Sequence, residues 1–247
     1  YLEVSFSNAC NFACAYCSPE ISSTWMKDIE ENGDYPVKFG SGNLDYLRSV
    51  EKFPYKHSDD NPYVDAFWKW FPEALPHLKV FRVTGGEPTM SKDVWKVLDY
   101  IYENAQPELS IAINSNLGTD PRLIQRLIDA CNKLEGKVKQ IEIYTSCEAI
   151  GEQAEYIRDG LDYNYWMANC ERVLSETNAN VAIMTTLNIL SMTTFNDFIE
   201  DIMKLRITYN KDLANNRIPL SVNYLRFPPH LQCTLLDIDT RISYANQ

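Results

Sequence analysis

Short apolar runs alternate with segments of helical periodicity along most of the chain. The near-continuous apolar run 181–187 indicates a strand buried on both faces. Apolar residues at i, i+3, i+4 and i+7, as in 94–101, indicate a helix with one buried face. Strands are predicted at 2–6, 78–84, 109–114, 138–145, 181–187 and 220–225. Helical stripes are predicted at 64–71, 94–101, 123–131, 166–174 and 195–202.

Strands joined through helices favour a parallel sheet, which could be an open doubly wound fold or a partial barrel. We predict an α/β fold, a partial (β/α)6 TIM-type barrel with parallel strands. Both candidate folds build their sites in the loops after the C-terminal strand ends. The 247 residues suit one such domain, so a single domain over 1–247 is expected.

One segment, 18–61, is far longer than the connection between a strand and a helix requires. It contains a predicted short helix at 23–31, Trp25 as an apolar anchor, and three glycines, Gly33, Gly40 and Gly42, that would permit movement. Because it starts directly after Cys17, we expect it to begin beside the cysteine site and to shape substrate access. The alternative is a disordered loop without that role.

Three of the seven cysteines lie within eight residues, in the run CNFACAYC from Cys10 to Cys17. Spacings of four and three residues let one loop wrap three thiolates around one metal centre. Three thiolates can hold three irons of a [4Fe–4S] cluster and leave the fourth iron open for a ligand. Cys10, Cys14 and Cys17 are therefore the candidate metal ligands.

Two other interpretations of the triplet are weaker. Three core cysteines would not need this regular spacing. A structural zinc site usually takes its four ligands as two pairs, but the chain has no second Cys-x-x-Cys and its three histidines form no paired motif. A zinc-binding interaction module is nevertheless kept as the non-catalytic alternative.

Charge and hydropathy exclude some classes of partner. The net charge of −11 argues against nucleic acid as the principal partner, because a phosphate backbone needs basic contacts. No apolar run approaches the roughly 18–20 residues that span a bilayer. We see neither a signal-type block nor a membrane segment, and expect a cytoplasmic protein.

The pattern Cys-x-x-x-Cys-x-aromatic-Cys after a first strand resembles the signature of the radical S-adenosylmethionine (SAM) superfamily, with Tyr16 in the aromatic position. Later elements are similar in order along nearly the whole chain. The resemblance is strongest to the branch with SPASM or twitch extensions, many of whose members modify peptides. It implies two cofactors, a [4Fe–4S] cluster and SAM, and places Tyr16 at the cofactor site.

Further motifs follow the predicted strands. Gly85, Gly86 and Glu87 resemble the family's Gly-Gly-Glu motif, which implies a contact with the methionyl amino group of SAM. Ser115 and Asn116 end the third strand and either hydrogen-bond a ribose or substrate or cap the turn around Gly118.

The ends of the fourth and fifth strands supply the other candidates. Ser146, Glu148 and Arg158 resemble the family's Ser-x-Asp-Gly and the arginine after it, with Glu in place of the commoner Asp. The resemblance implies Arg158 and Ser146 near the SAM carboxylate and Glu148 facing ribose or substrate. Asn188, at the end of the fifth strand, either reaches the nucleoside or caps a turn.

The resemblance implies reductive cleavage of SAM to a 5′-deoxyadenosyl radical, which abstracts hydrogen from a substrate. A peptide or protein side chain is the first candidate substrate, and a small polar metabolite, as in a radical dehydrogenase, is the alternative. The implied partners are SAM, the substrate and an electron donor such as flavodoxin or ferredoxin.

The remaining cysteines suggest no second cluster. Cys131 and Cys170 lie on helical stripes and are predicted to be core, and Cys147 is expected to pack near the SAM candidates. No cysteine follows Cys233 at ligand spacing. We therefore expect no C-terminal auxiliary-cluster extension in this chain; it lies outside the chain or this member lacks it.

Overall fold

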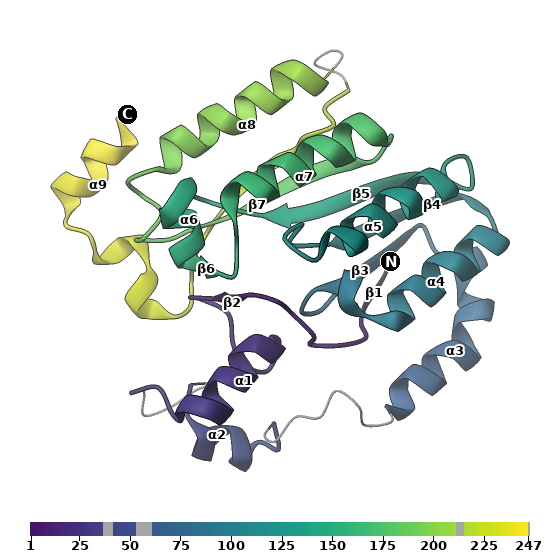
Figure 1. The fold of residues 1–247 in the computed structure, drawn as a ribbon, viewed down its shortest axis with the longest axis horizontal. Helices are drawn as coiled ribbons and strands as arrows, with labels where there is room; N and C mark the ends of the chain where they lie inside the picture. Colours follow the sequence, from purple (N-terminus) through teal and green to yellow (C-terminus); the bar gives the residue numbers. More distant parts are fainter. Residues whose placement is uncertain (37–41, 53–60, 211–214, 247) are drawn as a thin grey trace.

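The computed structural model describes residues 1–36, 42–52, 61–210 and 215–246. Its main feature is a six-stranded parallel sheet (Figure 1). In spatial order the strands are β1 (Leu2–Ser5), β3 (Val80–Thr84), β4 (Gln106–Asn114), β5 (Val138–Ser146), β7 (Asn180–Leu187) and β8 (Leu220–Tyr224). Within the described part of the chain, the edge strands β1 and β8 do not pair with each other, so the sheet is not closed. The predicted α/β fold with parallel strands is confirmed.

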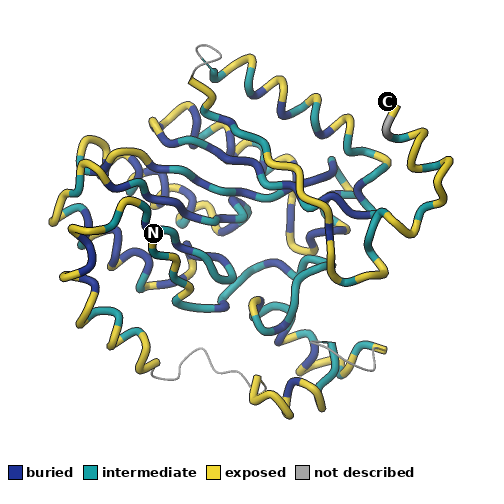
Figure 2. The backbone as a smooth tube through the Cα atoms, turned by 180° about the vertical axis from the view of Figure 1, so that it is seen from behind, coloured by how far each residue is buried: buried dark blue, intermediate teal, exposed yellow. Residues whose placement is uncertain are grey.

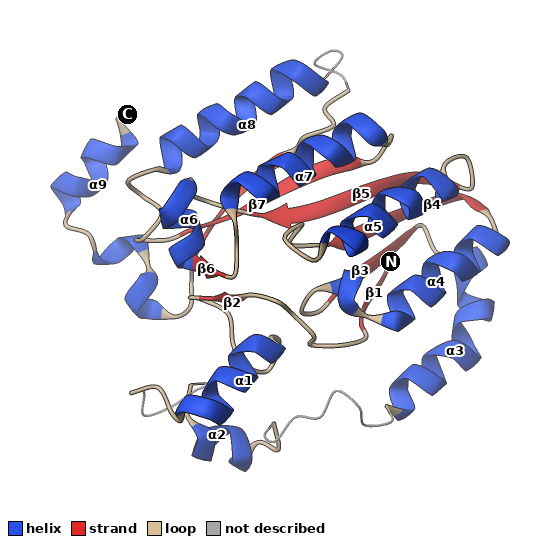
Figure 3. Cartoon of the chain, in the orientation of Figure 1, coloured by secondary structure: helices blue, strands red, loops and turns tan. Residues whose placement is uncertain are grey.

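Every helix predicted between strands is present and packs on the sheet. These helices are α3 (Pro62–Ala74), α4 (Lys92–Glu103), α5 (Pro121–Leu134), α7 (Tyr163–Glu176) and α8 (Phe195–Tyr209). The start of α5 shows how the sequence sets a helix boundary: the Asp120 side chain accepts a hydrogen bond from the Arg122 backbone, and Pro121 occupies the first helical position. Figure 3 shows α4, α5 and α7 lying side by side on one face of the sheet.

The core lies between these helices and the sheet. Side chains alternate across each strand, so Phe81 and Val83 of β3 are buried under the helices while Arg82 points to the opposite face. Figure 2 shows the buried residues concentrated in the sheet and along its covering helices. Cys131 and Cys170 are buried within this core, as predicted.

Several short elements were not predicted. Strand β2 (Ala13–Cys14) pairs antiparallel with β6 (Arg158–Asp159), which joins two segments far apart in the sequence. The other additions are α2 (Leu44–Ser49), α6 (Gly151–Ile157), α9 (Ile238–Ala245) and the 3-10 turns η1 (Leu75–His77), η2 (Pro88–Met90), η3 (Pro229–Leu231) and η4 (Cys233–Leu235). Two-residue strands, single turns and helices of six to eight residues carry too little periodicity to be predicted from a sequence.

The long segment after the cysteines contains α1 (Ser23–Asn32), which confirms the helix predicted at 23–31. Gly40 lies outside the described residues. In Figure 1, α1 and α2 lie together beneath β2, away from the sheet. Among the described residues, no helix has the length and apolar character required to cross a bilayer.

Candidate functional site

The three motif cysteines lie on one loop between β1 and α1. Cys14 is in β2, and the Cys17 backbone donates a hydrogen bond of 2.9 Å to the Cys14 carbonyl, so the last two cysteines form one turn. All three are free thiols of intermediate exposure. The loop therefore presents its sulfur atoms at the edge of the fold, at the C-terminal end of the sheet.

The thiols affect one another electrostatically. Burial, with a smaller contribution from charge on Cys14, raises the pKa of Cys10 to about 11 and that of Cys17 to about 12. Three thiolates at this site would therefore need a nearby positive charge, which a metal bound by them would supply. In the described chain no three His, Cys, Asp or Glu side chains converge as ligands of a single ion.

The first turn of α1 braces the cysteine loop. The hydroxyls of Ser23 and Thr24 donate to the Cys10 carbonyl, at 3.1 and 2.7 Å, and the Ser23 hydroxyl accepts from the Cys10 backbone at 3.0 Å. The Trp25 indole donates to the Cys14 carbonyl at 2.9 Å. Sequence reasoning missed these contacts; the run of hydroxyl residues at the start of the helix, with Ser22 as its N-cap, was the available signal.

Gly85 and Gly86 lie directly against the backbone that leads into the cysteine loop. A Cβ on Gly86 would come within 2.4 Å of the Ala9 carbonyl oxygen, and one on Gly85 within 2.5 Å of the Ser7 oxygen. Gly85 also has a φ of +129°, which favours glycine. The two glycines thus let β3 end in close contact with the chain just before Cys10.

Glu87 is buried, and its carboxylate accepts four hydrogen bonds from the protein. The Thr89 backbone and hydroxyl donate at 3.0 and 2.7 Å, the Ser115 hydroxyl at 3.0 Å, and the Asn116 backbone at 2.6 Å. Burial raises the pKa of Glu87, and these donors oppose that rise. Glu87 therefore ties the end of β3 to the end of β4, and a ligand amine would have to share an oxygen with these donors.

Asn116 joins the same arrangement to the cysteine loop. Its side-chain amide donates to the side-chain oxygen of Asn11 at 2.8 Å, and its own oxygen accepts from the Gly118 backbone at 2.9 Å. Asn11 in turn donates to the Gly118 carbonyl at 2.9 Å. The predicted turn around Gly118 is present, and it also anchors the residue after Cys10.

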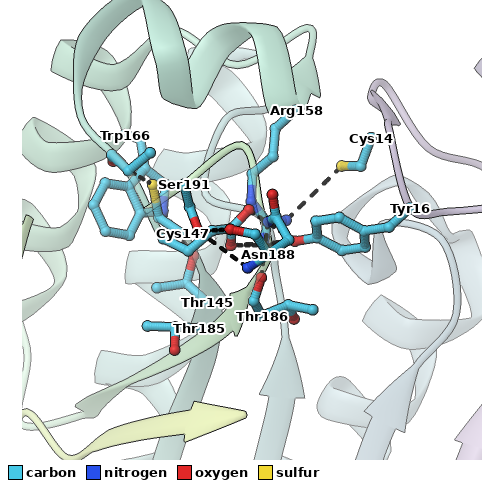
Figure 4. A network of polar contacts seen from close by, with 12 residues as sticks. Cys14, Tyr16, Thr145, Cys147, Arg158, Trp166, Thr185, Thr186, Asn188 and Ser191 are labelled. Atoms are coloured by element: carbon cyan, nitrogen blue, oxygen red, sulfur yellow. Dashed lines mark hydrogen bonds and ion pairs between the residues drawn. The ribbon is translucent and has the colours of Figure 1, made fainter. Parts of the chain in front are cut away.

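Arg158, Glu148 and Tyr16 form a hydrogen-bonded network beside Cys14. Figure 4 labels Arg158, Tyr16 and Cys14. The Arg158 Nη2 atom donates to Glu148 at 2.6 Å and also to the Tyr16 hydroxyl. The Tyr16 hydroxyl donates to the Glu148 carboxylate at 3.0 Å. Glu148 charge raises the pKa of Arg158 against the effect of burial, so the guanidinium stays charged. Within the described structure, Arg158 Nε is buried without a hydrogen-bond partner.

The other two candidates, Asn188 and Ser146, differ in whether their side chains already hydrogen-bond to the protein. Asn188 is buried, and its side chain donates to the Thr186 carbonyl at 2.9 Å and accepts from the Leu190 backbone at 3.0 Å, as in a capped turn. Ser146 is the last residue of β5 and is half-buried, on the sheet face opposite the helices. No described side chain or backbone group hydrogen-bonds to its hydroxyl.

Sequence reasoning also missed a polar group on that open sheet face. Arg82 donates to the Asn114 side chain at 3.0 Å and lies over the Tyr144 ring, with 4.4 Å between the guanidinium carbon and the ring centroid. An arginine in an otherwise apolar strand, as in 80–84, was the signal.

A cavity of about 750 Å³ opens beside Tyr16 and Cys17. Residues of the long segment, including Ile21, Trp25 and Tyr35, line this cavity together with 227–230. A smaller pocket of about 470 Å³ adjoins it and shares Trp25, Tyr35 and His230 as lining residues. Cys233 lies elsewhere, with its sulfur 3.6 Å from the Met192 sulfur.

Sequence comparison finds a family match over most of the chain. The profile described as the Radical SAM superfamily matches residues 4–206. A GTP 3′,8-cyclase of Pectobacterium atrosepticum is 27% identical over 203 residues, which is 81% of this chain and 51% of that protein. A GTP 3′,8-cyclase of a Sulfurovum species is 25% identical over 130 residues, covering 53% of this chain and 31% of that protein. The chain thus spans about half the length of these relatives, or less.

Solved structures show a similar fold. The crystal structure of SuiB from Streptococcus suis aligns with a TM-score of 0.57 at 12% identity, covering 99% of this chain and 44% of SuiB. SuiB bound to S-adenosylmethionine aligns with a TM-score of 0.53 at 11% identity, covering 91% of this chain and 50% of that one. At these identities the likeness is one of fold.

Proposed function

The chain belongs to the radical SAM superfamily, and from that membership we propose that it holds a [4Fe–4S] cluster on Cys10, Cys14 and Cys17 and modifies a peptide or protein side chain. The superfamily's cofactors are this cluster and SAM, which together supply a 5′-deoxyadenosyl radical by reductive cleavage of SAM. Placement in the SPASM or twitch branch stays a prediction from the cysteine motif.

The described residues fit these cofactors. Three half-buried thiols share one loop, and three thiolates on one loop are the ligand set that a [4Fe–4S] cluster with one open iron needs. Cys17 also borders a large cavity, so a ligand can reach the loop from outside. Seven free cysteines suit a reducing compartment, and the cytoplasm is the proposed location.

The proposed SAM contacts follow from which polar groups are still available. Ser146 presents a hydroxyl at the C-terminal end of β5, where it could donate to the SAM carboxylate or ribose. Gly85 and Gly86 would offer backbone groups to the methionyl amine, with Glu87 setting their position through its bonds to 115–116. Three other candidates already bond protein groups through their side chains, so we propose that they hold the surrounding loops in place: Asn116, Glu148 and Asn188.

The observation that carries the substrate proposal is the lining of the cavity beside Cys17. Its walls are largely apolar and aromatic, with Trp25, Tyr35 and Phe227 among them, and the described lining residues include one acid, Glu20, and no Lys or Arg. A triphosphate needs cationic partners, whereas apolar peptide side chains do not. The described apolar and aromatic lining residues therefore support a peptide side chain as the substrate.

A second candidate is cyclisation of a purine nucleotide, favoured by the name GTP 3′,8-cyclase carried by the sequence relatives. Arg82, on the open face of the sheet, is a cation that such a substrate could use. A small polar metabolite remains the third candidate. An electron donor such as flavodoxin or ferredoxin is proposed for all three, because each needs one electron to cleave SAM.

The test is anaerobic reconstitution with iron and sulfide, followed by reduction with dithionite in the presence of SAM. Formation of 5′-deoxyadenosine supports the proposed chemistry; iron-replete protein that forms none contradicts it. Parallel reactions with GTP and with short peptides encoded beside the gene then separate the candidates. Consumption of GTP with a new cyclised product would replace the peptide proposal.

A further inference from the structure

The small sheet β2–β6 fixes Arg158 opposite one cysteine of the triplet. Cys14 and Arg158 are direct partners in its antiparallel register. The adjoining Ala15 backbone donates a hydrogen bond of 2.7 Å to the Ile157 carbonyl, which extends the contact. A Cβ on Gly160 would come within 2.7 Å of the Asn11 oxygen, so the chain after β6 also lies close against the cysteine loop. Backbone pairing between β2 and β6 therefore places Arg158 next to Cys14.

The Arg158 side chain then reaches back to the sulfur. Its Nη1 atom lies 3.8 Å from Cys14 Sγ, and a dashed line in Figure 4 marks this contact. Arg158 is 6% exposed and Glu148 is 1% exposed. Glu148 and Tyr16 both bind Nη2, so they leave Nη1 aimed at the sulfur.

We propose that Arg158 acts on the iron–sulfur cluster through Cys14 and raises its reduction potential, with Glu148 and Tyr16 as positioning residues. The inference rests on the proposed function, because it concerns the cluster that the triplet would hold. Reduction of the [4Fe–4S]2+ state to the 1+ state adds one electron and no proton in this scheme. A buried cation beside a ligating sulfur stabilises the more negative state, and hydrogen bonds to cluster sulfurs are an established control of potential.

The sign of each contribution is definite. The guanidinium favours the reduced cluster and raises the potential, whereas the Glu148 carboxylate opposes it. Replacing Arg158 by Gln removes the positive charge and should lower the potential. Replacing Glu148 by Gln removes the negative charge but keeps an oxygen that can accept from Arg158 Nη2, so the guanidinium stays in place and the potential should rise. A purely structural role for the pair would not give opposite shifts from its two members.

The experiment is an EPR-monitored redox titration of reconstituted protein without SAM, using dithionite as the reductant. Arg158→Gln is expected to shift the midpoint potential downward and Glu148→Gln upward, each at unchanged iron and sulfide content. Arg158→Lys keeps the charge and should lie between wild type and Arg158→Gln. The matched control is Arg172→Gln, which removes the same charge from an exposed pair with Glu176 on α7 and should leave the potential unchanged.

Shifts of the same sign in Arg158→Gln and Glu148→Gln, or none beyond the control, would overturn the proposal. If Arg158→Gln loses its cluster, the midpoint potential of Glu148→Gln is the test. An upward shift supports the proposal, and no upward shift contradicts it. A wild-type protein that binds no iron would instead refute the proposed function.

Discussion

The indole nitrogen of Trp25 donates a hydrogen bond of 2.9 Å to the carbonyl oxygen of Cys14. Trp25 also packs edge-on against Tyr35, with 4.9 Å between ring centroids. One side chain therefore couples the long segment after the triplet to the backbone of a cysteine ligand, and it lines the adjoining cavity as well.

We predict that Trp25→Phe keeps the aromatic packing but loosens the cysteine loop. Loss of one neutral hydrogen bond should cost about 1 kcal/mol. Because that bond holds the Cys14 carbonyl, the variant should lose iron faster than wild type when a chelator is added. Chelation rates measured by absorbance of the iron complex check this; equal rates in the two proteins would contradict it.

Replacing Cys10, Cys14 and Cys17 together by Ala should abolish iron binding and the brown colour of anaerobically reconstituted protein. The expected wild-type content is about four irons per chain. The single variant Cys233→Ala is the control, because that sulfur contacts Met192 and not the triplet. It should keep full iron content; retention of iron by the triple variant would end the cluster assignment.

Gly86→Ala should damage the cluster site through sterics alone. The new Cβ would meet the backbone oxygens of Ala9 and Asn8 at 2.4 and 2.6 Å, so the chain entering the cysteine loop must move. Lower iron content is expected after reconstitution, together with a lower melting temperature.

The matched control for that variant is Gly136→Ala. Gly136 has a φ of +71°, but a methyl group added there would meet no atom within 4 Å, so only backbone strain of about 1–2 kcal/mol applies. It should lower the melting temperature without changing iron content. Equal iron loss in both variants would point to general instability instead of the local clash.

Glu87→Ala should destabilise the protein as well as weaken SAM binding. Its carboxylate accepts hydrogen bonds from buried donors, and a buried donor left unpaired costs about 1–3 kcal/mol. Urea unfolding of the metal-free protein measures this apart from any ligand. Glu87→Gln, which retains an acceptor oxygen, should fall between wild type and Glu87→Ala; unfolding free energies equal to wild type in both would show that the network contributes nothing.

Phe227→Ala should impair use of the substrate while leaving the fold intact. Phe227 lines the cavity beside Cys17 and is 72% exposed, so truncation should change stability by less than about 0.5 kcal/mol. Iron content and uncoupled cleavage of SAM should persist, while product formed per SAM cleaved should fall. Ile207→Ala, on the exposed side of α8, is the control; equal coupling in both variants would remove 227–230 from the substrate site.

The sequence by itself determined the order of strands and helices, because periodicity is a local property that survives without tertiary context. It also identified Cys10, Cys14 and Cys17 as neighbours, since three ligands within eight residues are held together by the covalent chain. The sequence showed that Gly86 and Glu87 form a motif, but it did not show which residues they contact. Glu87 binds Asn116 and Gly86 packs on Ala9 only after β1, β3 and β4 have aligned their ends.

Tertiary structure alone decided the neighbours of Cys14. Arg158 lies 144 positions away in sequence, and a two-residue strand has no periodicity that would predict its pairing. The sequence could say that Arg158 was suited to gripping a carboxylate; it could not say that the carboxylate bound in this fold is Glu148. A buried arginine needs a nearby compensating negative charge, and which acidic side chain lies near enough is decided only when the chain has folded.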